Sequence, residues 1–511
     1  MKYYVGIDVG TSGAKALIMD AKGDVLATAV GEYPCHCPRP SWSEQDPRDW
    51  WKGSIKAVRL AIKSAGIDAR NVAGVGLSGQ MHGLVVTDSA GKPLRPSIIW
   101  NDQRTAEQAC QIEDRAGGKA RLIAMVGNVA VTSFTLTKLL WVRQHEPRVY
   151  DKIRHLLLPK DYVRLCMTGE YAGDVSDMSG TLMLDQRKRD WSKAILSLFQ
   201  IDREILPNVV ESHEIAGRLT AEAAEALGLP AGTPVAAGGG DQPVGAVGNG
   251  VVTQGLTSAT IGTSGVVYVH SKDYHVDRQG RLQTFCSCVA GQWCMFGCVL
   301  AAGGSLQWYR NQLGQAELAE AQKKKIDPYD LLVQQAAAAP AGCEGLFWLP
   351  YLTGERTPHG DPRAKACWIG ITNRTTRNEL VRSVMEGATF AMNDAVTLVR
   401  ELDLPVRQIR LSGGGARSSF WRQLQADIYG RPCVTINSEQ GPAYGAAILA
   451  AVGTGEFRNV AQACQAAIRV KQTILPNRKT QALYARHYAQ YRRLYPALKA
   501  QFAEIDELAR V

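Results

Sequence analysis

The sequence predicts an α/β protein built from two homologous domains that face one another across a cleft. The tetrapeptide GTSG occurs at Gly10 to Gly13 and again at Gly262 to Gly265, separated by about half of the chain. Each copy follows a short apolar run and precedes a second one, so the flanking pattern repeats together with the motif. At 511 residues the chain is also too long for a single hydrophobic core. Strand-like runs that enter glycine turns and are followed by helical periodicity favour the α/β class.

The composition is that of an ordinary globular protein and excludes several other classes. Hydrophobic residues make up 45% and charged residues 21% of the chain. The net charge of +10 is spread over the whole length and forms no dense basic stripe with interleaved aromatic residues. We therefore expect no nucleic-acid partner.

The cysteines and the hydropathy pattern predict a reducing, cytoplasmic environment. Cys286, Cys288, Cys294 and Cys298 lie closest together among the 12 cysteines, but their spacing is not that of paired Cys-x₂-Cys zinc ligands. The segment around them alternates like a pair of strands, which predicts buried free thiols. No signal peptide precedes Asp8 and no apolar run reaches transmembrane length, so we expect no membrane association.

The N-terminal segment predicts three antiparallel strands. Apolar runs at Tyr3–Asp8, Ala16–Met19 and Val25–Val30 are separated by the GTSG loop and by a turn at Asp20–Asp24. A Walker loop would place its glycines between a strand and a helix, which this segment does not do. Glycine N–H groups and hydroxyls at a hairpin tip can bind phosphate, although an ordinary hairpin turn is the alternative.

A helix should begin after Asp46 and end at Gly66. Asp46 is placed to cap it and Pro47 to occupy its first turn. Its predicted apolar face consists of Trp51, Ile55, Val58 and Ile62.

Two polar loops follow predicted strands and are candidates for binding a polyol. The strand Val72–Leu77 leads into a loop that carries Gln80, Met81 and His82, where a structural histidine is the alternative interpretation. The strand that ends at Trp100 leads into the cluster Asn101-Asp102-Gln103-Arg104, whose side chains offer many donors and acceptors.

The segment Gly238 to Gly250 lies near the midpoint of the chain and carries the main catalytic candidate. Residues 105–235 before it are predicted to be mainly helical and indicate little chemistry. Three glycines, which would let a ligand approach the backbone, lead to Asp241 at the start of a predicted helix. Simple capping of that helix is the alternative role for its carboxylate.

The second half repeats the hairpin and adds a glycine turn between a strand and a helix. The strand Ile409–Leu411 enters Ser412–Ser418, a setting that exposes N–H groups to an anion or a flat ring. A long helix is predicted over Arg377–Leu402, and small residues from Gly441 predict a closely packed helix. The chain from Gln481 onward is predicted to be an amphipathic packing helix that is interrupted at Pro496.

The ordered motifs resemble those of the FGGY family of carbohydrate kinases. The resemblance rests on GIDVGTSGAK, SGQMHG, WNDQR, GGGDQ, IGTSG and SGGGARS, and it covers nearly the whole chain. It implies two actin-like, ribonuclease H-like domains, as in the sugar kinase, heat-shock ATPase and actin superfamily. Within the family the chain is most similar to xylulokinases, on the strength of QMHG, WSEQDP, WNDQR and LPYLTGERTPH.

The resemblance also implies roles for individual residues. Asp241 would be the catalytic base, and Asp8 would help to hold Mg²⁺. ATP would be bound by Thr11, Ser12, Lys15, Gly262, Thr263, Gly414, Gly415, Ala416, Ser418 and Ser419. The sugar would be bound by Gln80, Met81, His82, Trp100, Asn101, Asp102, Asp241 and Gln242. Gln242 departs from the asparagine that many xylulokinases carry and matches glycerol kinases, so the resemblance leaves the exact polyol open.

The implied activity is ATP-dependent phosphorylation of D-xylulose at its terminal hydroxyl. Two alternatives stay open: a kinase for another pentulose or polyol, such as ribulose, a tetrulose or glycerol, and an actin-like ATPase without a sugar substrate. The expected division is an N-terminal domain at 1–250, a C-terminal domain at 251–455 and a helical extension at 456–511. Homodimers occur among the family, so a homodimer is one assembly that the resemblance allows.

Overall fold

The computed structural model describes residues 1–508 and contains two compact α/β units. The first unit comprises Met1–Thr253, His270–Cys294 and Gln440–Arg469. The second comprises Gln254–Val269, Met295–Glu439 and the chain from Val470 onward. The segment Gln440–Arg469 thus belongs by its contacts to the first unit, although it follows most of the second in sequence. No helix in the described part of the chain is long and apolar enough to cross a bilayer.

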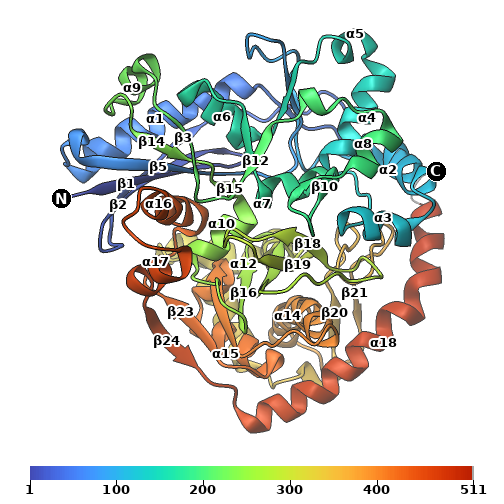
Figure 1. Cartoon of the computed structure of the whole chain (residues 1–511). Coiled ribbons are helices and arrows are strands. Elements are labelled where there is room, and N and C mark those ends of the chain that lie inside the picture. Colours follow the sequence, from blue (N-terminus) through green and yellow to red (C-terminus); the bar gives the residue numbers. More distant parts are fainter. Residues whose placement is uncertain (509–511) are drawn as a thin grey trace. The chain divides into compact units, whose positions relative to one another are not determined.

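The first unit is organised around a mixed sheet with the strand order β13-β14-β5-β1-β2-β3 (Figure 1). Its strands are β1 (Tyr3–Val9), β2 (Gly13–Asp20), β3 (Val25–Glu32), β5 (Val72–Gly79), β13 (Ile215–Arg218) and β14 (Pro234–Ala236), and β15 (Gly239–Gly240) also pairs with β5. β1, β2 and β3 are antiparallel neighbours, which confirms the predicted meander. β5 lies parallel to β1, and β14 and β15 lie parallel to β5.

Helices cover both faces of this sheet. α1 (Pro47–Ala65) packs on β2 and β3, and α16 (Gly441–Gly453) packs on β1, β2 and β5, as Figure 1 shows. α16 approaches the sheet so closely that an added Cβ at Gly6 or at Gly76 would lie 1.9 Å from a carbonyl oxygen of this helix. This contact confirms the close packing that the small residues of α16 predict.

The helix α1 has the predicted ends but a buried face that differs in part. Asp46 accepts a hydrogen bond from the backbone N–H of Arg48, and Gly66 adopts the left-handed conformation at the C-terminus. The buried side chains include Trp50, Ala57, Val58 and Ala61, whereas the predicted Trp51, Ile55 and Ile62 are only half-buried. The predicted face is therefore confirmed in part, because Val58 is buried and Trp51, Ile55 and Ile62 pack against the same core. The centre of the buried face differs because the helix is positioned by the contact of Gly53 with the Gly31 carbonyl, where only glycines fit.

The remaining elements of the first unit surround the ends of this sheet. Its other helices are α2 (Ala106–Arg115), α3 (Lys119–Val126), α4 (Thr135–His145), α5 (Pro147–Tyr150), α6 (Pro159–Thr168), α7 (Val175–Met178), α8 (Lys193–Phe199), α9 (Ala221–Leu227), α10 (Asp241–Gly248) and α17 (Val460–Ala467). Its short strands are β4 (Glu44–Gln45), β6 (Val85–Thr87), β7 (Ser97–Ile98), β8 (His155–Leu157), β9 (Ala172–Asp174), β10 (Leu184–Asp185), β11 (Asp190–Trp191) and β12 (Asn208–Val210). The helical content predicted for residues 105–235 is confirmed.

The second sheet repeats the pairing pattern of the first. Its order is β18-β19-β17-β16-β22-β23-β24. The strands are β16 (Leu256–Ile261), β17 (Gly265–Ser271), β18 (Gln283–Cys286), β19 (Trp293–Val299), β22 (Gln408–Gly413), β23 (Cys433–Ile436) and β24 (Val470–Ile474). β16 and β17 form an antiparallel hairpin, β16 is parallel to β22 and β22 is parallel to β23, as β1, β2, β5 and β14 are arranged in the first sheet. The repeat inferred from the two GTSG copies is therefore a repeat of topology.

The other elements of the second unit are mainly helical. They are α11 (Gly303–Leu313), α12 (Gln315–Lys324), α13 (Pro328–Ala338), α14 (Arg377–Glu401), α15 (Ser419–Tyr429), α18 (Arg478–Leu508) and the strand pair β20 (Phe347–Leu349) and β21 (Cys367–Ile369). α14 has the predicted length and starts at a capping box between Thr376 and Glu379.

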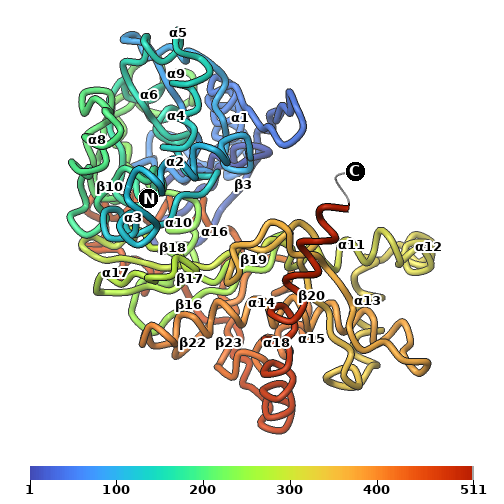
Figure 2. Tube along the Cα trace, turned by 90° about the vertical axis from the view of Figure 1, so that its right-hand side faces the viewer, coloured from blue at the N-terminus to red at the C-terminus, as the bar shows by residue number. Residues whose placement is uncertain are grey.

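The C-terminal helix α18 packs against α15 (Figure 2), and a stripe of tyrosines anchors it. The hydroxyls of Tyr484, Tyr488 and Tyr495 donate to Glu386, Asp394 and Asp361 respectively, and the Tyr491 hydroxyl lies 3.3 Å from that of Tyr351. The helix continues through Pro496, so the predicted interruption is wrong. The tyrosines before the proline, and the buried Phe502 and the Lys365–Asp506 ion pair after it, hold the helix and offset the hydrogen bond that proline removes.

We expect Tyr484→Phe to destabilise the second unit by about 1–2 kcal/mol. The Tyr484 hydroxyl donates to the Glu386 carboxylate at 2.7 Å and accepts from the Arg382 guanidinium at 2.8 Å, and all three side chains are buried. The measurement is the free energy of unfolding in denaturant. Tyr3→Phe is the matched control, because the described part of the chain shows no hydrogen bond to the Tyr3 hydroxyl. Equal stability of the two variants would contradict the anchoring role.

Candidate active site

The first GTSG loop joins β1 to β2 and is held in place by buried side chains. The Gly10 N–H donates to the Gly13 carbonyl and closes the turn. The Gln45 side-chain amide donates to the Thr11 carbonyl at 2.7 Å and accepts from the Gln80 amide at 2.7 Å. Gln80 itself is buried, so the structure gives it the role of supporting this loop. Gln45 was not recognised from the sequence, because no local pattern connects it with Thr11, which lies 34 residues earlier.

The tip of the same loop carries the hydroxyl side chains of Thr11 and Ser12, which can contact a ligand. The Ser12 side chain is exposed. The Thr11 hydroxyl accepts a hydrogen bond from the indole N–H of Trp100 at 3.0 Å, and the Trp100 side chain is 39% exposed. This hydrogen bond joins the predicted phosphate loop, at Thr11, to the predicted sugar-binding loop that begins at Trp100, within the first unit.

Asp8 and Lys15 lie opposite each other where β1 and β2 meet the loop. They are register partners in the antiparallel pair, and Ser78 is the partner of Asp8 on the parallel strand β5. Burial raises the pKa of the Asp8 carboxyl, which Ser78 and the Lys15 ammonium partly offset, and burial lowers the pKa of Lys15. The Oδ1 atom of Asp8 is buried without a hydrogen-bond partner in the described structure. Such an oxygen is suited to a ligand that the protein alone does not supply.

Asp241 is the first residue of α10, directly after the strand β15. Its Oδ1 accepts a hydrogen bond of 3.3 Å from the Gln242 side-chain amide. Burial raises the pKa of Asp241 to about 7, and the negative charge of Asp8 adds to that rise. A carboxylate with a pKa close to the working pH is suited to act as a general base. Helix capping does not account for Asp241, because Gly240 occupies the cap position.

The three glycines before Asp241 are required by contacts with protein. Gly238 has a φ of +75°, and an added Cβ there would lie 2.0 Å from the Leu77 carbonyl oxygen. Added Cβ atoms at Gly239 and Gly240 would lie 2.5 Å from the Ser176 hydroxyl and 2.8 Å from Met81. The expectation that these glycines admit a ligand is therefore wrong. They bring β15 close against β5 and so set the position of Asp241.

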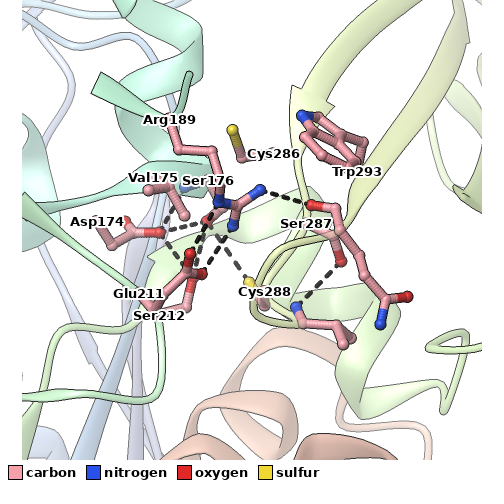
Figure 3. A network of polar contacts seen from close by, with 12 residues as sticks. Asp174, Val175, Ser176, Arg189, Glu211, Ser212, Cys286, Ser287, Cys288 and Trp293 are labelled. Atoms are coloured by element: carbon pink, nitrogen blue, oxygen red, sulfur yellow. Dashed lines mark hydrogen bonds and ion pairs between the residues drawn. The ribbon is translucent and has the colours of Figure 1, made fainter. Parts of the chain in front are cut away.

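A buried polar network, drawn in Figure 3, lies beside Gly239. One oxygen of Asp174 accepts from the backbone N–H and hydroxyl of Ser176 and from the hydroxyl of Ser212. The Cys288 thiol lies 3.5 Å from the Ser176 hydroxyl. Cys286, Cys288 and Cys294 are buried free thiols, as predicted, whereas Cys298 is a free thiol that is only half-buried. No group of potential metal ligands gathers in the described residues.

A second buried cluster, around Lys160, supports the same region. The Lys160 ammonium lies 2.5 Å from Asp161, 2.9 Å from Asp174 and 3.6 Å from Asp177. The pKa of Asp177 is raised well above its ordinary value, first by burial and then by the surrounding carboxylates, with Asp241 among them. These residues were missed from the sequence, although charged side chains within predicted buried helices were an available signal.

The residues expected to bind sugar have different environments. Met81 is buried against Gly240, and His82 is only 8% exposed. Asn101 is exposed. Asp102 is fully buried, and its carboxylate accepts from the Arg104 guanidinium and from the Ser43 N–H. The expectation that Asp102 contacts the sugar is therefore not supported, because its oxygens are already engaged by the loop.

The second unit brings its predicted nucleotide loops together. Gly262 and Thr263 are exposed at the tip of the β16–β17 hairpin. Their carbonyls accept from the N–H groups of Gly303 and Gly304 at 2.9 and 2.8 Å, so the start of α11 is fixed on the hairpin. This glycine pair was missed in the sequence, where two glycines opening a helix were the available signal.

The glycine turn after β22 adjoins the strand that leads into this hairpin. An added Cβ at Gly415 would lie 2.7 Å from Ile261, whereas at Gly414 the nearest atom would be 3.7 Å away. Gly414 thus has open space that the fold does not fill. Ser418 caps α15 by accepting from the Trp421 N–H, and Ser419, the first residue of that helix, is exposed, whereas Ala416 is half-buried.

The two sheets repeat one topology, with a GTSG hairpin in each, and so define a two-domain α/β protein with an internal repeat. Sequence profiles of the FGGY family of carbohydrate kinases match this chain, the N-terminal domain over residues 3–248 and the C-terminal domain over residues 257–454. The chain belongs to the FGGY family of carbohydrate kinases.

Three relatives show how far the similarity extends. The chain is 37% identical to the "Xylulose kinase" of Escherichia coli (strain K12) over 496 residues, which cover 97% of this chain and 99% of the relative. It is similar to the crystal structure of a "xyloylose kinase" from Brucella ovis, with 33% identity, a TM-score of 0.90 and coverage of 98% and 100%. It is also similar to the crystal structure of a gluconate kinase from Lactobacillus acidophilus, with 26% identity, a TM-score of 0.91 and coverage of 99% of both chains. The protein is thus a carbohydrate kinase.

Proposed function

We propose that this kinase transfers the γ-phosphoryl group of ATP to the terminal hydroxyl of D-xylulose, with ADP and D-xylulose 5-phosphate as products. The observation that carries the proposal is the Asp241 carboxylate, held at the start of α10 with a pKa of about 7 beside Asp8. The xylulose kinases among the relatives support the choice of sugar. We place the reaction in the cytoplasm, where ATP is available.

Asp241 is proposed to accept the proton of the attacking hydroxyl. In phosphoryl transfer the protein mainly positions the reactants and neutralises charge, while the nucleophile must lose its proton. A carboxylate can do this when it is ionised at the working pH and reaches the hydroxyl. Gln242, which donates to Asp241 at 3.3 Å, orients the carboxylate within the same site.

Each unit is proposed to supply nucleotide contacts from its own hairpin loop. In the first unit Thr11, Ser12 and Lys15 supply hydroxyl and ammonium donors for the transferred phosphoryl group. In the second unit the exposed Gly262 and Thr263 are proposed to lie against the phosphates, with the Thr263 hydroxyl as a donor, while the N–H groups of Gly303 and Gly304 hold this tip in place. The open space at Gly414, together with Gly415, Ala416, Ser418 and Ser419, is proposed to receive the nucleoside.

The residues present fit a magnesium ion that accompanies ATP. Mg²⁺ is bound by one or two carboxylates together with water and substrate phosphates. The unpartnered oxygen of Asp8 meets this requirement, and no larger ligand set is needed. When bound, the ion would neutralise charge on the phosphates. Asp8 is the residue that would hold it.

The sugar is proposed to contact His82 and Met81, with Trp100 and Asn101 at the edge of the site. A different sugar acid or polyol is the second candidate, because the gluconate kinase matches this chain with a TM-score of 0.91. Gln242 supports that candidate, since its side chain is longer than that of the asparagine that many xylulokinases carry. An ATPase that needs no sugar gives no reason for the QMHG and WNDQR loops.

The test is ADP release from Mg·ATP with D-xylulose, D-ribulose, L-ribulose, xylitol, glycerol and D-gluconate. We expect D-xylulose to raise the rate at least about tenfold more than any other compound, because pocket contacts discriminate similar substrates by about that factor. Stronger stimulation by another compound would keep the kinase and change the substrate. ATP hydrolysis without stimulation by any compound would favour the ATPase.

A further inference from the structure

His82 has a backbone conformation that needs support from its surroundings. Its φ is +70°, in the left-handed region that residues other than glycine rarely adopt. Such a conformation costs energy and persists only where surrounding contacts hold it, and it is most frequent at functional sites. The contacts that hold His82 are therefore informative about the loop.

The His82 ring is fixed by residues of three other segments. Its Nδ1 lies 3.0 Å from the Gly180 carbonyl oxygen, and an added Cβ at Gly180 would lie 2.4 Å from that nitrogen. Phe134 meets the ring edge to face at 4.9 Å, and Phe285 lies 6.1 Å away. The direction of the imidazole is thus closely constrained.

The His82 carbonyl is held by two side chains of α4. The Lys138 ammonium donates to the His82 carbonyl at 2.7 Å and to the Ser133 carbonyl at 2.5 Å. The Thr135 hydroxyl donates to the His82 carbonyl at 3.2 Å. Two donors therefore converge on the backbone carbonyl oxygen of the residue that has the unusual φ.

Burying the Lys138 ammonium costs desolvation free energy, so stability alone does not explain a lysine at this position. Its side chain has no exposed surface, and no carboxylate in the described structure pairs with it directly. Burial lowers the pKa of Lys138 to about 7, while Asp102 raises it and Arg104 lowers it further. A methionine would fill a similar volume without this desolvation. The lysine is therefore better explained by its hydrogen bonds to the His82 and Ser133 carbonyls.

We propose that Lys138 is a positioning residue for the loop that carries Gln80, Met81 and His82. The Lys138 ammonium fixes the His82 carbonyl and thereby directs His82 and Met81 toward the substrate. This inference rests on the proposed contact between His82 and the sugar. Lys138 touches neither sugar nor nucleotide, and it acts only through the loop.

The test compares the KM for the sugar with the KM for ATP in the full-length protein. Lys138→Met should raise the sugar KM about tenfold or more, because the loop loses its main support, and leave the ATP KM within about twofold. Lys138→Gln keeps an N–H donor and should recover part of the loss. Thr135→Val removes the second donor and should raise the sugar KM by a smaller factor, about two- to fivefold.

Leu139→Ala is the matched control for loss of stability. Leu139 is the next residue on α4 and is fully buried, but its apolar side chain carries no donor for the His82 carbonyl. This variant should lower the melting temperature and leave the sugar KM within about twofold. If Lys138→Met does not fold, Lys138→Gln and Thr135→Val decide the question.

His82→Ala separates failure of this inference from failure of the proposed function. A raised sugar KM in His82→Ala with unchanged values in Lys138→Met, Lys138→Gln and Thr135→Val would overturn the role of Lys138 alone. An unchanged sugar KM in folded His82→Ala would overturn the sugar contact itself. A raised sugar KM in both sets of variants, with the Leu139→Ala control unaffected, would support the inference.

Discussion

Asp241→Ala is expected to lower kcat for sugar phosphorylation by about 10²- to 10⁴-fold, which is the range that a general base contributes. The reason is that the hydroxyl would then have no group to accept its proton. ATP should still bind, because the proposed nucleotide contacts lie in the hairpin and glycine loops. The measurements are kcat by coupled ADP release and the affinity for ATP by calorimetry.

Two controls make this result interpretable. Asp202→Asn alters an exposed aspartate that caps a short helix of the first unit, and it should leave kcat unchanged. Asp241→Asn tests folding. Because the pKa of Asp241 is higher in the native state than the unfolded value of 3.8, its contribution to the free energy of unfolding is fully present below pH 3.8 and is lost as the pH rises to about 7. Removing the charge should therefore leave the melting temperature at pH 8 equal or higher. Near-normal turnover in a folded Asp241→Ala protein would exclude the role of base.

Asp8→Asn is expected to lower the rate about 100-fold and to shift its pH dependence. The neutral amide is a poorer ligand for Mg²⁺ than a carboxylate, and the loss would raise the magnesium concentration that the enzyme needs. The negative charge of Asp8 also contributes to the raised pKa of Asp241, so its removal should lower that pKa.

The sign of the pH effect follows from which form of Asp241 is active. Only the ionised carboxylate can accept a proton, so kcat/KM of the natural protein should fall about tenfold for each pH unit below 7. In Asp8→Asn the same decline should begin at a lower pH. The measurement is kcat/KM for the sugar between about pH 5 and about pH 9, a range that includes both protonation states of Asp241. A decline that stays at the same pH would show that Asp8 does not affect Asp241.

Much of the fold could be predicted because its signals are local. The two hairpins follow from apolar runs around GTSG, and the ends of α1 follow from Asp46 and Gly66, which act on their own turns. The start of α10 at Asp241 follows from the glycines before it in the same way. In each case the interacting groups are separated by only a few residues.

Predictions failed where the deciding contact came from a distant segment. The centre of the buried face of α1 is set by a glycine contact with β3, and the helix through Pro496 is maintained by tyrosines that bond to α14 and the loop at Asp361. The glycines before Asp241 serve the packing on β5, and this depends on Leu77 far earlier in the chain. Sequence patterns contain no information about such partners until the strands are paired.

The sequence by itself determined the class of fold, the family and the residue types of the candidate site, because motifs such as GTSG and GGGDQ act through their own backbone and immediate neighbours. Only the tertiary structure decided how these residues are supported. Lys138 reaches the His82 carbonyl from α4, and Lys160 gathers three carboxylates near the strand that precedes Asp241. Burial and charge depend on everything that packs around a group, so the raised pKa of Asp241 arises only when β1, β15 and α10 come together.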